Sequence, residues 1–386
     1  MHCKLTNKKI LNNWVKNVVL TVFGSVSVAL MALTVGFSDF FDNLFLETND
    51  LIIAGIILLV SFFGTVFLTK KWIKSAKAAK LEGKDMNKPD KPLIPRSGGL
   101  IVAIVVCFSV LIYVFLKTFS MLGTPQTNVV EAFAITSTIL LAGFIGFVDD
   151  ILGWKTGLSQ LQKIFLTIPI ALPLTVLNVN TTIMTIPFLG QVDFGLLYPL
   201  LIVPLGIIGA TNGFNLLAGY NGLEASMGLV IFATFGVTSI IVGRLWIALV
   251  CMIVYASLLG FLAFNWHPAK VFPGNSFSYA IGALIGTLAI LGSMERIAVW
   301  LFMLYILEIL LYMRARLIDK AGDVQAFAKV NEDGSLELPY EHIYDTTHLA
   351  IWVLKKLKTK VYEKDVVLFI VAVQSVIAVL GLLLIV

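Results

Sequence analysis

The chain has 386 residues, of which 58% are hydrophobic and only 13% are charged, and its formal net charge is +5. Repeated apolar runs of about twenty residues match the thickness of a bilayer's hydrocarbon core, so the composition excludes a soluble globular domain. The basic residues lie between the apolar runs, where membrane orientation explains them better than a nucleic-acid partner does. Cys107 and Cys251 lie inside apolar runs, so we expect packing residues rather than a disulfide framework.

The apolar runs predict an all-α polytopic membrane protein with about eleven transmembrane helices. The predicted spans are 17–37, 50–69, 98–116, 130–148, 161–177, 196–214, 226–243, 245–263, 277–294, 298–313 and 366–386. Residues 1–49 are interpreted as a cytoplasmic tail with one extra helix, and residues 50–386 as a ten-helix core. The segment Ser27-Val28-Ala29 leaves a second interpretation open, in which the first span is a cleaved signal peptide.

The distribution of basic residues predicts the orientation of these spans. With the amino terminus in the cytoplasm, every Lys and Arg falls on the cytoplasmic side except Lys117, Arg244 and Arg296. The predicted cytoplasmic loops are 70–97, 149–160, 215–225, 264–276 and 314–365. The resulting prediction is a multi-pass membrane protein whose polar loops face the cytoplasm.

The last cytoplasmic loop contains two predicted elements. The stretch AKVNEDGSLELP, residues 328–339, alternates apolar and polar residues on both sides of a turn, which predicts a small β-hairpin. After it, helical spacing aligns an apolar stripe beside a lysine-rich face: Leu349, Trp352, Val353, Leu357 and Val361. This pattern is typical of a helix at an anionic membrane surface, and equally of an amphipathic helix packed on protein.

Four polar clusters fall on the cytoplasmic side. They are PLIPRSGG at 92–99, VDD at 148–150, TNGFNLLAGYNGLEA at 211–225 and FNWHPAKVFPGNSF at 264–277. Carboxylates and carboxamides are oxygen ligands for Mg²⁺, and a lysine offers charge to phosphate. Asp149 and Asp150 are the expected centre of such a site, unless they only end a helix at the interface. If this interpretation holds, Lys163 is a phosphate ligand. The alternative is that Lys163 is a lysine whose side chain extends to the membrane interface.

The asparagines of the third cluster favour ligand recognition. Asn212 and Asn215 are three residues apart and share one face of a helix. Gly219 and Gly222 bracket Asn221 in a turn where the backbone can approach a ligand closely. Carboxamides recognise both donor and acceptor groups, as a nucleobase or an N-acetyl group requires. The alternative is interhelical hydrogen bonding inside the membrane.

These motifs resemble one known family, the polyprenyl-phosphate N-acetylhexosamine-1-phosphate transferases. The resemblance covers residues 50–386 and is closest to the eukaryotic and archaeal branch. It is carried by GFVDD, by TNGFNLLAGYNGLEA, by FNWHPAKVFPG followed by SFSYAIG, and by the GSLELPY hairpin. The resemblance implies transfer of a sugar-1-phosphate from a UDP-sugar to a polyprenyl phosphate, with release of UMP and use of Mg²⁺.

The resemblance also implies roles for individual residues. It places Asp149 and Asp150 beside the lipid phosphate and the metal, and Lys163 on phosphate. It implies the metal or the diphosphate as the partner of Asn215. The residues implied for substrate binding, with uridine at the central turn, are Arg96, Ser97, Asn212, Gly219, Asn221, Gly222 and Arg316.

The chain departs from the family pattern at two places. Where the family has Gly-Asp-Thr, this chain has Gly274-Asn275-Ser276, so a carboxylate that resembles a metal ligand is replaced. Asn275 can still coordinate a metal through its carbonyl oxygen, without charge. In the loop after the tenth helix, RARLIDKAGDVQAF replaces the basic and histidine-rich motifs of the relatives, and Arg316 is among the nearest basic substitutes.

The expected function is therefore transfer of N-acetylhexosamine-1-phosphate, most simply GlcNAc-1-phosphate, to a polyprenyl or dolichyl phosphate. This would be the first membrane step of N-glycan-type assembly. The expected partners are a UDP-N-acetylhexosamine, the polyprenyl phosphate, the bilayer and Mg²⁺, with Mn²⁺ as an alternative, and a homodimer is compatible with them. Two other interpretations stay open: a secondary transporter with polar residues at broken helices, and a catalytically weakened scaffold relative. Direct attack by the lipid phosphate is the favoured mechanism, with Asp149 as a covalent nucleophile the alternative.

Overall fold

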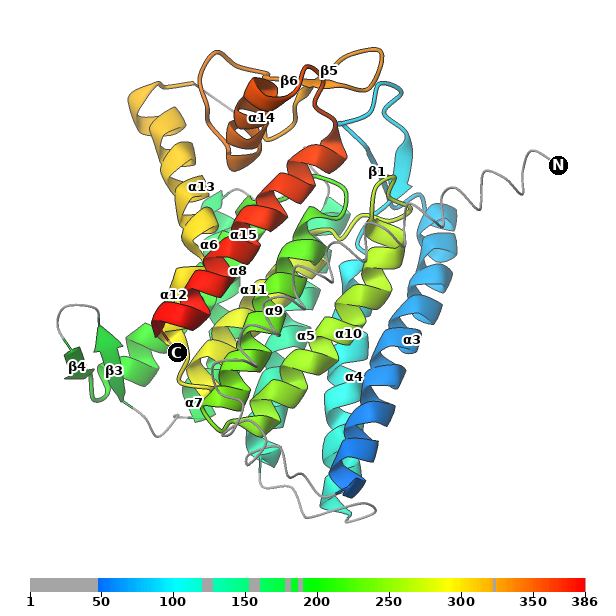
Figure 1. The fold of residues 1–386 in the computed structure, drawn as a ribbon. Helices are drawn as coiled ribbons and strands as arrows, with labels where there is room; N and C mark the ends of the chain where they lie inside the picture. The colour runs from blue at the N-terminus through cyan, green and yellow to red at the C-terminus, as the bar shows by residue number, and fades with distance from the viewer. Residues whose placement is uncertain are drawn as a thin grey trace.

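The computed structural model describes residues 48–119, 128–152, 160–177, 182–186, 190–321 and 324–385 (Figure 1). The predicted span 17–37 lies outside these residues. The described part is a helical bundle with three small strand pairs. Its principal helices are α3 (Thr48–Ala78), α4 (Gly99–Thr118), α5 (Val129–Leu152), α8 (Val203–Leu216), α9 (Leu223–Ile241), α10 (Leu245–Asn265), α11 (Asn275–Leu291) and α15 (Glu363–Ile385).

Within the described residues, seven helices are long and apolar enough to cross a membrane. The number is eight when α12 (Glu295–Leu301) and α13 (Met303–Met313), which meet at a bend of 53°, count as one span. The prediction of a polytopic helical protein is confirmed at this level. The ten spans predicted between 50 and 386 all fall on helical segments, but the count of eleven is not confirmed.

The predicted span 161–177 shows one reason for the difference. It consists of α6 (Gln160–Thr167), a 3₁₀ turn over Ile168–Ala171 and α7 (Leu172–Leu177). Pro169 and Pro173 lie at the two junctions. Proline has no backbone N–H and clashes with the preceding turn, so a continuous helix is interrupted where hydropathy alone predicts a span.

Helix α11 lies in the interior of the bundle and contacts both α5 and α8. Small residues allow the backbones to approach closely, as in many membrane helix pairs. A Cβ atom at Gly282 would lie 2.5 Å from the carbonyl oxygen of Ala210 in α8. A Cβ atom at Gly146 in α5 would lie 2.3 Å from the carbonyl oxygen of Asn275. Each glycine is therefore a steric requirement of the packing that positions the start of α11.

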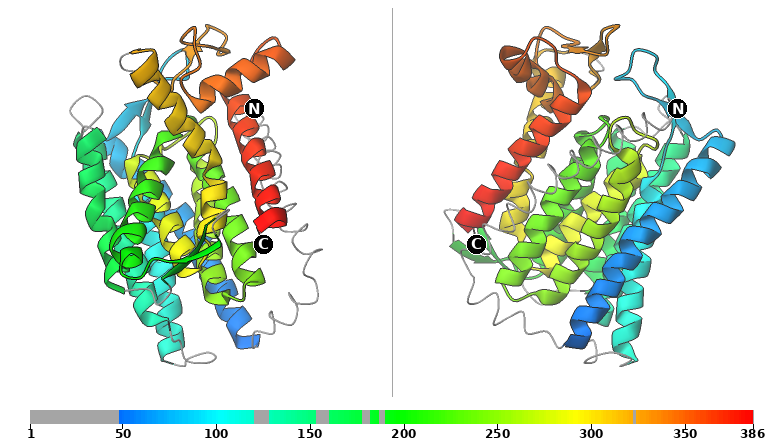
Figure 2. Two further views of the ribbon diagram at one scale, coloured as in Figure 1. Left: turned by 90° about the vertical axis from the view of Figure 1, so that its left-hand side faces the viewer. Right: turned by 45° about the vertical axis from the view of Figure 1, so that its right-hand side comes forward.

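The strands form three antiparallel pairs. They are β1 (Glu82–Lys84) with β2 (Leu93–Pro95), β3 (Ile183–Ile186) with β4 (Gly190–Asp193), and β5 (Lys329–Val330) with β6 (Leu336–Glu337). The last pair confirms the predicted hairpin. The views in Figure 2 place β3–β4 away from α14, and β1–β2 at the end of the bundle that carries α14.

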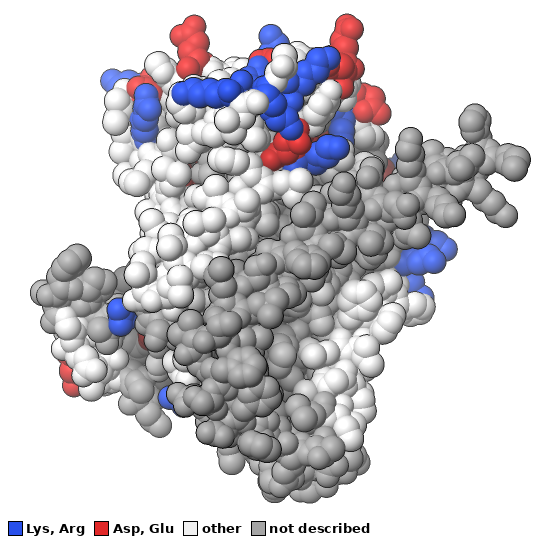
Figure 3. Space-filling view, in the orientation of Figure 1, with Lys and Arg blue, Asp and Glu red and all other residues white. Residues whose placement is uncertain are grey.

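Helix α14 (Thr346–Leu357) corrects the predicted amphipathic stripe. The helix ends at Leu357, so Val361 lies beyond it, and the backbone oxygen of Val361 accepts a hydrogen bond from Leu336 of the hairpin. Ala350 and Ile351 are buried against the protein, whereas Trp352 and Leu357 are exposed. One face of the helix therefore packs on the protein, and the placement of the exposed face at a membrane surface stays a prediction. In Figure 3, Lys, Arg, Asp and Glu side chains gather over this end of the molecule.

Replacing Gly282 by alanine should lower the free energy of unfolding by about 1–3 kcal/mol, because the new methyl group meets backbone of α8 that cannot move aside cheaply. Gly209→Ala on α8 is the matched control, since nothing lies within 4 Å of its Cβ position. The measurement is thermal unfolding in detergent, followed by intrinsic fluorescence. Equal midpoints for the two variants would contradict the proposed close packing of α11.

Candidate active site

The two aspartates at the end of α5 are both buried, and they make different contacts. The side chain of Asp149 is 3% exposed and that of Asp150 is 1% exposed. Asp149 Oδ2 lies 2.8 Å from Lys163 Nζ of α6 and accepts a hydrogen bond of 2.6 Å from Asn275 Nδ2 of α11. Three residues predicted from distant sequence clusters therefore meet at one carboxylate.

Asp150 connects α5 to the first turn of α11. Its carboxylate accepts hydrogen bonds from the backbone N–H groups of Asn275, at 2.9 Å, and Ser276, at 3.3 Å. It also forms an ion pair of 3.2 Å with Arg96. A carboxylate at a helix N-terminus is stabilised by the unpaired N–H groups and by the helix dipole. The prediction that Asp150 also binds metal stays a prediction, and the structure adds a positioning role to it.

Gly274 makes the approach of Asp150 possible. Its φ angle is +74°, and a Cβ atom there would lie 2.3 Å from Asp150 Oδ2. Glycine is the residue that accepts this backbone conformation and leaves this space. The Gly274-Asn275-Ser276 segment therefore holds the Asp150 carboxylate through its backbone, with Asn275 at the position where the resemblance implies an acidic residue.

The two predicted asparagines of α8 point to different neighbours. Asn215 Oδ1 accepts a hydrogen bond from the hydroxyl of Ser278, one turn into α11. Asn212 Nδ2 donates to Thr167 Oγ1 at 3.0 Å and to the carbonyl oxygen of Ile208 at 2.9 Å. The contact of Asn212 with Thr167 of α6 is an interhelical hydrogen bond, as in the alternative interpretation, and its substrate role stays a prediction. Asn215 is linked to the same helix start as Asn275.

The turn between α8 and α9 has the conformation that its glycines suggest. Gly219 and Gly222 have φ angles of +95° and +84°. Between them, buried Asn221 donates its backbone N–H to Glu363 Oε1 at 2.8 Å and its Nδ2 to Asp85 Oδ2 at 3.0 Å. Asp85, more than a hundred positions away in the chain, thus holds the side-chain amide of Asn221 in one orientation.

Sequence reasoning missed the residues that support this turn. Asn87 Nδ2 donates to the carbonyl oxygen of Gly219 at 3.2 Å, and the Lys88 ammonium pairs with both Asp85 and Glu363. One signal was readable. The segment GKDMNK combines a carboxylate, a carboxamide and lysines on the predicted cytoplasmic side, the same combination that marked the other clusters.

Arg96 and Ser97 follow β2 and are tied to the start of α11. The Phe272 N–H donates to the Pro95 carbonyl oxygen at 2.7 Å, and the Gly98 N–H donates to the Phe272 carbonyl oxygen at 2.9 Å. Ser97 is fully buried with a φ angle of +59°. Its neighbour Arg96 thereby reaches Asp150, as the predicted cluster requires.

Arg316 differs from the other predicted residues. It is exposed on the π-helical segment Arg314–Ile318, and its Nε donates to the hydroxyl of Tyr312 at 3.2 Å. Its substrate-binding role stays a prediction.

The donor chemistry fits a hard cation that shares its ligands with phosphate. Among the described residues, no group of three or more His, Cys, Asp and Glu side chains converges on one point. Asn275 contacts Asp149 through its side-chain amide and Asp150 through its backbone N–H, and Asn215 reaches the same first turn of α11 through Ser278. Mg²⁺ is commonly held by one or two carboxylates, with waters and substrate phosphates completing its octahedron. These residues match that pattern.

The structure thus combines a helical bundle with several apolar, membrane-capable helices and a buried polar cluster at the end of α5. Residues 132–293 match the family model described as glycosyl transferase family 4. The chain is 35% identical over 328 residues to a protein of Saccharolobus solfataricus, covering 84% of this chain and 95% of the relative. That relative carries the provisional name UDP-N-acetylglucosamine–dolichyl-phosphate N-acetylglucosaminephosphotransferase.

Two further relatives agree with this match. A Sulfolobus acidocaldarius protein of the same provisional name is 36% identical over 286 residues, covering 73% of this chain and 83% of the relative. A phospho-N-acetylmuramoyl-pentapeptide-transferase of Clostridium perfringens is 33% identical over 223 residues, covering 56% of this chain and 67% of the relative. The chain belongs to this family, the polyprenyl-phosphate N-acetylhexosamine-1-phosphate transferases.

Replacing Asn275 by aspartate should destabilise the metal-free protein, because a second carboxylate would face Asp149 where an amide now donates. We expect a loss of about 1–3 kcal/mol in the presence of EDTA, and recovery on addition of Mg²⁺. Asn275→Ala is the control, since it removes the donor without adding charge and should not recover. Thermal unfolding across a Mg²⁺ titration gives the comparison. Identical metal responses of the two variants would remove residue 275 from the metal site.

Proposed function

We propose that this protein transfers N-acetylglucosamine-1-phosphate from UDP-N-acetylglucosamine to dolichyl or another polyprenyl phosphate, releasing UMP as the first membrane step of N-glycan-type assembly. The observation that carries the proposal is the contact of Asp149 with both Lys163 and Asn275, within a family whose archaeal members carry that name. Membership of this family supports a transferase rather than the transporter alternative.

The active site faces the cytoplasm in this proposal. In Figure 1 the β1–β2 pair lies at the end of the bundle that carries α14, and Arg96, which follows β2, pairs with Asp150 at the end of α5. Figure 3 shows Lys and Arg side chains gathered over the same end. The positive-inside rule assigns that side to the cytoplasm. One substrate has a membrane-embedded tail and the other is a soluble nucleotide, so they meet at this interface.

The reaction is direct attack of a lipid phosphate oxygen on the β-phosphorus of the UDP-sugar. A new phosphorus–oxygen bond forms, the bond to the α-phosphate oxygen breaks, and UMP leaves with that electron pair. A phosphate monoester has a second pKa of about 6, so at pH 7 the nucleophile is mostly a dianion and a general base has little to remove. Catalysis then depends on positioning and on charge stabilisation.

The charged residues of the cluster supply that stabilisation. Lys163 and Arg96 each pair with an aspartate in the described structure, so both cations are held in fixed positions beside the carboxylates. A phosphate that enters the cluster would share these cations. Mg²⁺, when bound by Asp149, Asp150, Asn215 and Asn275, would supply Lewis-acid stabilisation of the diphosphate. Mn²⁺ prefers similar oxygen ligands and is an alternative.

Asn221 is the proposed reader of the uracil base. Because its Nδ2 is committed to Asp85, the carbonyl oxygen of the planar amide faces the other way and presents an acceptor. Uracil offers an N–H donor at the ring position where cytosine has an acceptor. This orientation therefore favours UDP-sugars over CDP-sugars.

Purified protein with UDP-N-acetylglucosamine, polyprenyl phosphate and Mg²⁺ should release UMP, and omission of the lipid phosphate or of Mg²⁺ should stop the release. Asp149→Asn should lower the rate at least about tenfold, because it weakens the Lys163 ion pair and removes a charged ligand. Asp90→Asn is the control, because Asp90 is exposed in the loop between β1 and β2. Release of UDP would show attack at the sugar carbon and refute the proposed reaction.

Asn221→Ala should raise KM for the UDP-sugar more than it lowers kcat, because a base contact stabilises ground state and transition state alike. The preference for the UDP-sugar over the matching CDP-sugar should fall at the same time. Steady-state kinetics with both nucleotides measures the two effects. A collapsed kcat with unchanged KM and unchanged base preference would assign Asn221 to chemistry instead of recognition.

A further inference from the structure

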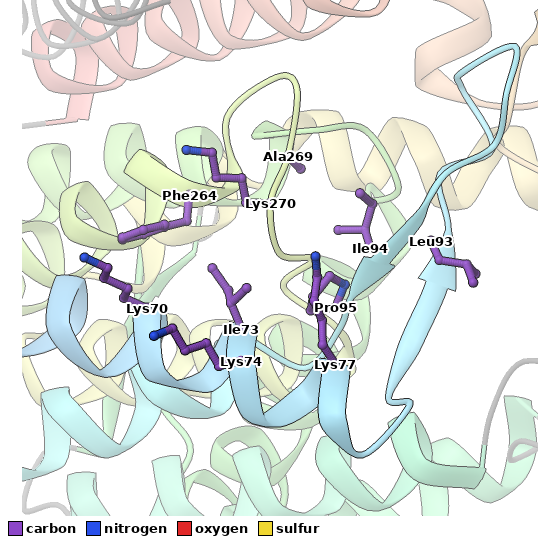
Figure 4. Close-up of a pocket in the computed structure, with 10 residues that line it drawn as sticks. All are labelled: Lys70, Ile73, Lys74, Lys77, Leu93, Ile94, Pro95, Phe264, Ala269 and Lys270. Atoms are coloured by element: carbon purple, nitrogen blue, oxygen red, sulfur yellow. The ribbon is translucent and has the colours of Figure 1, made fainter. Parts of the chain in front are cut away.

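A cavity of about 420 Å³ lies between the end of α3 and the 264–270 turn (Figure 4). Lys70, Lys74 and Lys77 border it from α3, and Lys270 borders it from the turn. The spacing of the three α3 lysines places them on one face of that helix. Within the described residues none of the four has an ion-pair partner, and all four are exposed. An anion would relieve the repulsion between these like charges.

The walls of the same cavity are apolar. Ile73 lies between the lysines of α3, Phe264 ends the opposite helix α10, and Pro95 closes the side formed by β2. A small soluble anion would make no favourable contact with these apolar walls. An amphiphile with an anionic head and an apolar body matches both parts.

The helix that carries the lysines also carries a lipid-facing stripe. Leu59, Phe63 and Phe67 are 58%, 60% and 57% exposed at successive turns of α3. In a membrane-spanning helix these side chains contact acyl chains. Lys70 follows Phe67 by less than one turn, so the cavity begins where the apolar stripe ends, at the depth of lipid head groups.

We propose that this cavity binds the phosphate head group of an anionic membrane phospholipid in the cytoplasmic leaflet, with its acyl chains along α3. The site goes beyond the proposed transferase function, and the acceptor phosphate is assigned to the Asp149 cluster. The bound lipid bridges α3 and the 264–270 turn. Phe272, two residues after that turn, donates its backbone N–H to the carbonyl oxygen of Pro95 in β2 at 2.7 Å. The lipid thereby braces the segment that carries Arg96.

The test measures lipid binding and needs no catalysis. The full-length protein in detergent is titrated with phosphatidylglycerol, and with phosphatidylcholine as the neutral lipid, and bound lipid is counted by native mass spectrometry. The double variant Lys74→Gln with Lys270→Gln should bind phosphatidylglycerol at least about tenfold more weakly, since each lysine near a membrane surface contributes about fivefold. The control double variant, Lys71→Gln with Lys356→Gln, removes two exposed lysines outside the cavity and should retain binding.

A second variant separates the cavity from general surface charge. Ile73→Trp fills the space and keeps all four lysines, so it should also weaken phosphatidylglycerol binding, and it serves if the charge variant does not fold. Equal losses in the cavity and control variants, or full binding by Ile73→Trp, would overturn the proposal. Displacement of the lipid by inorganic phosphate or UDP-N-acetylglucosamine would assign the cavity to a soluble anion, and preferential binding of polyprenyl phosphate there would assign it to the acceptor. Either result refutes the phospholipid site.

Discussion

The structure depends on one buried carboxylate, that of Asp150. It accepts the first N–H groups of α11 and pairs with Arg96, so three segments separated by more than fifty residues in the chain are held at one point. A buried carboxylate is costly unless its oxygens are paired. The α11 N-terminus and Arg96 supply those partners, and Gly274 leaves the space for them. These contacts of Asp150 fix the end of α5, and so they also position the neighbouring Asp149.

Asp149 and Asp150 are adjacent and chemically identical, but they make different contacts. Neighbouring positions on a helix point about 100° apart, so Asp149 faces Lys163 and the Asn275 side chain while Asp150 faces the Asn275 backbone. A cation and two phosphates entering the site would compete for the side-chain contacts of Asp149. The backbone contacts of Asp150 can persist through the same event. In the proposed mechanism, Asp149 would therefore exchange its partners during the reaction, while Asp150 would keep its contacts with the start of α11.

The sequence predicted which elements exist better than it predicted where they break. Apolar runs identify membrane helices because burial in hydrocarbon depends on composition, and each run from 50 onward is helical. The interruption at Pro169 and the 53° bend between α12 and α13 depend on local backbone hydrogen bonds that hydropathy does not measure. The stripe through Val361 failed for a similar reason, since the hairpin recruits that residue's backbone oxygen.

The site was predictable where a residue's chemistry conflicts with its surroundings. Asp149, Asp150 and Asn221 are polar groups beside apolar runs, and such placement demands a partner. Asp85 and Glu363 also need partners because they are buried. The composition of GKDMNK marks Asp85 as part of a polar cluster, but it does not indicate that either carboxylate is buried. Their burial becomes visible only when the chain is folded. The sequence also does not show which polar groups contact each other. Asn221 is oriented by Asp85 and Glu363, each more than a hundred residues away in the chain. The proposed recognition of the base therefore depends on tertiary contacts that orient Asn221, and not on the sequence of the turn alone.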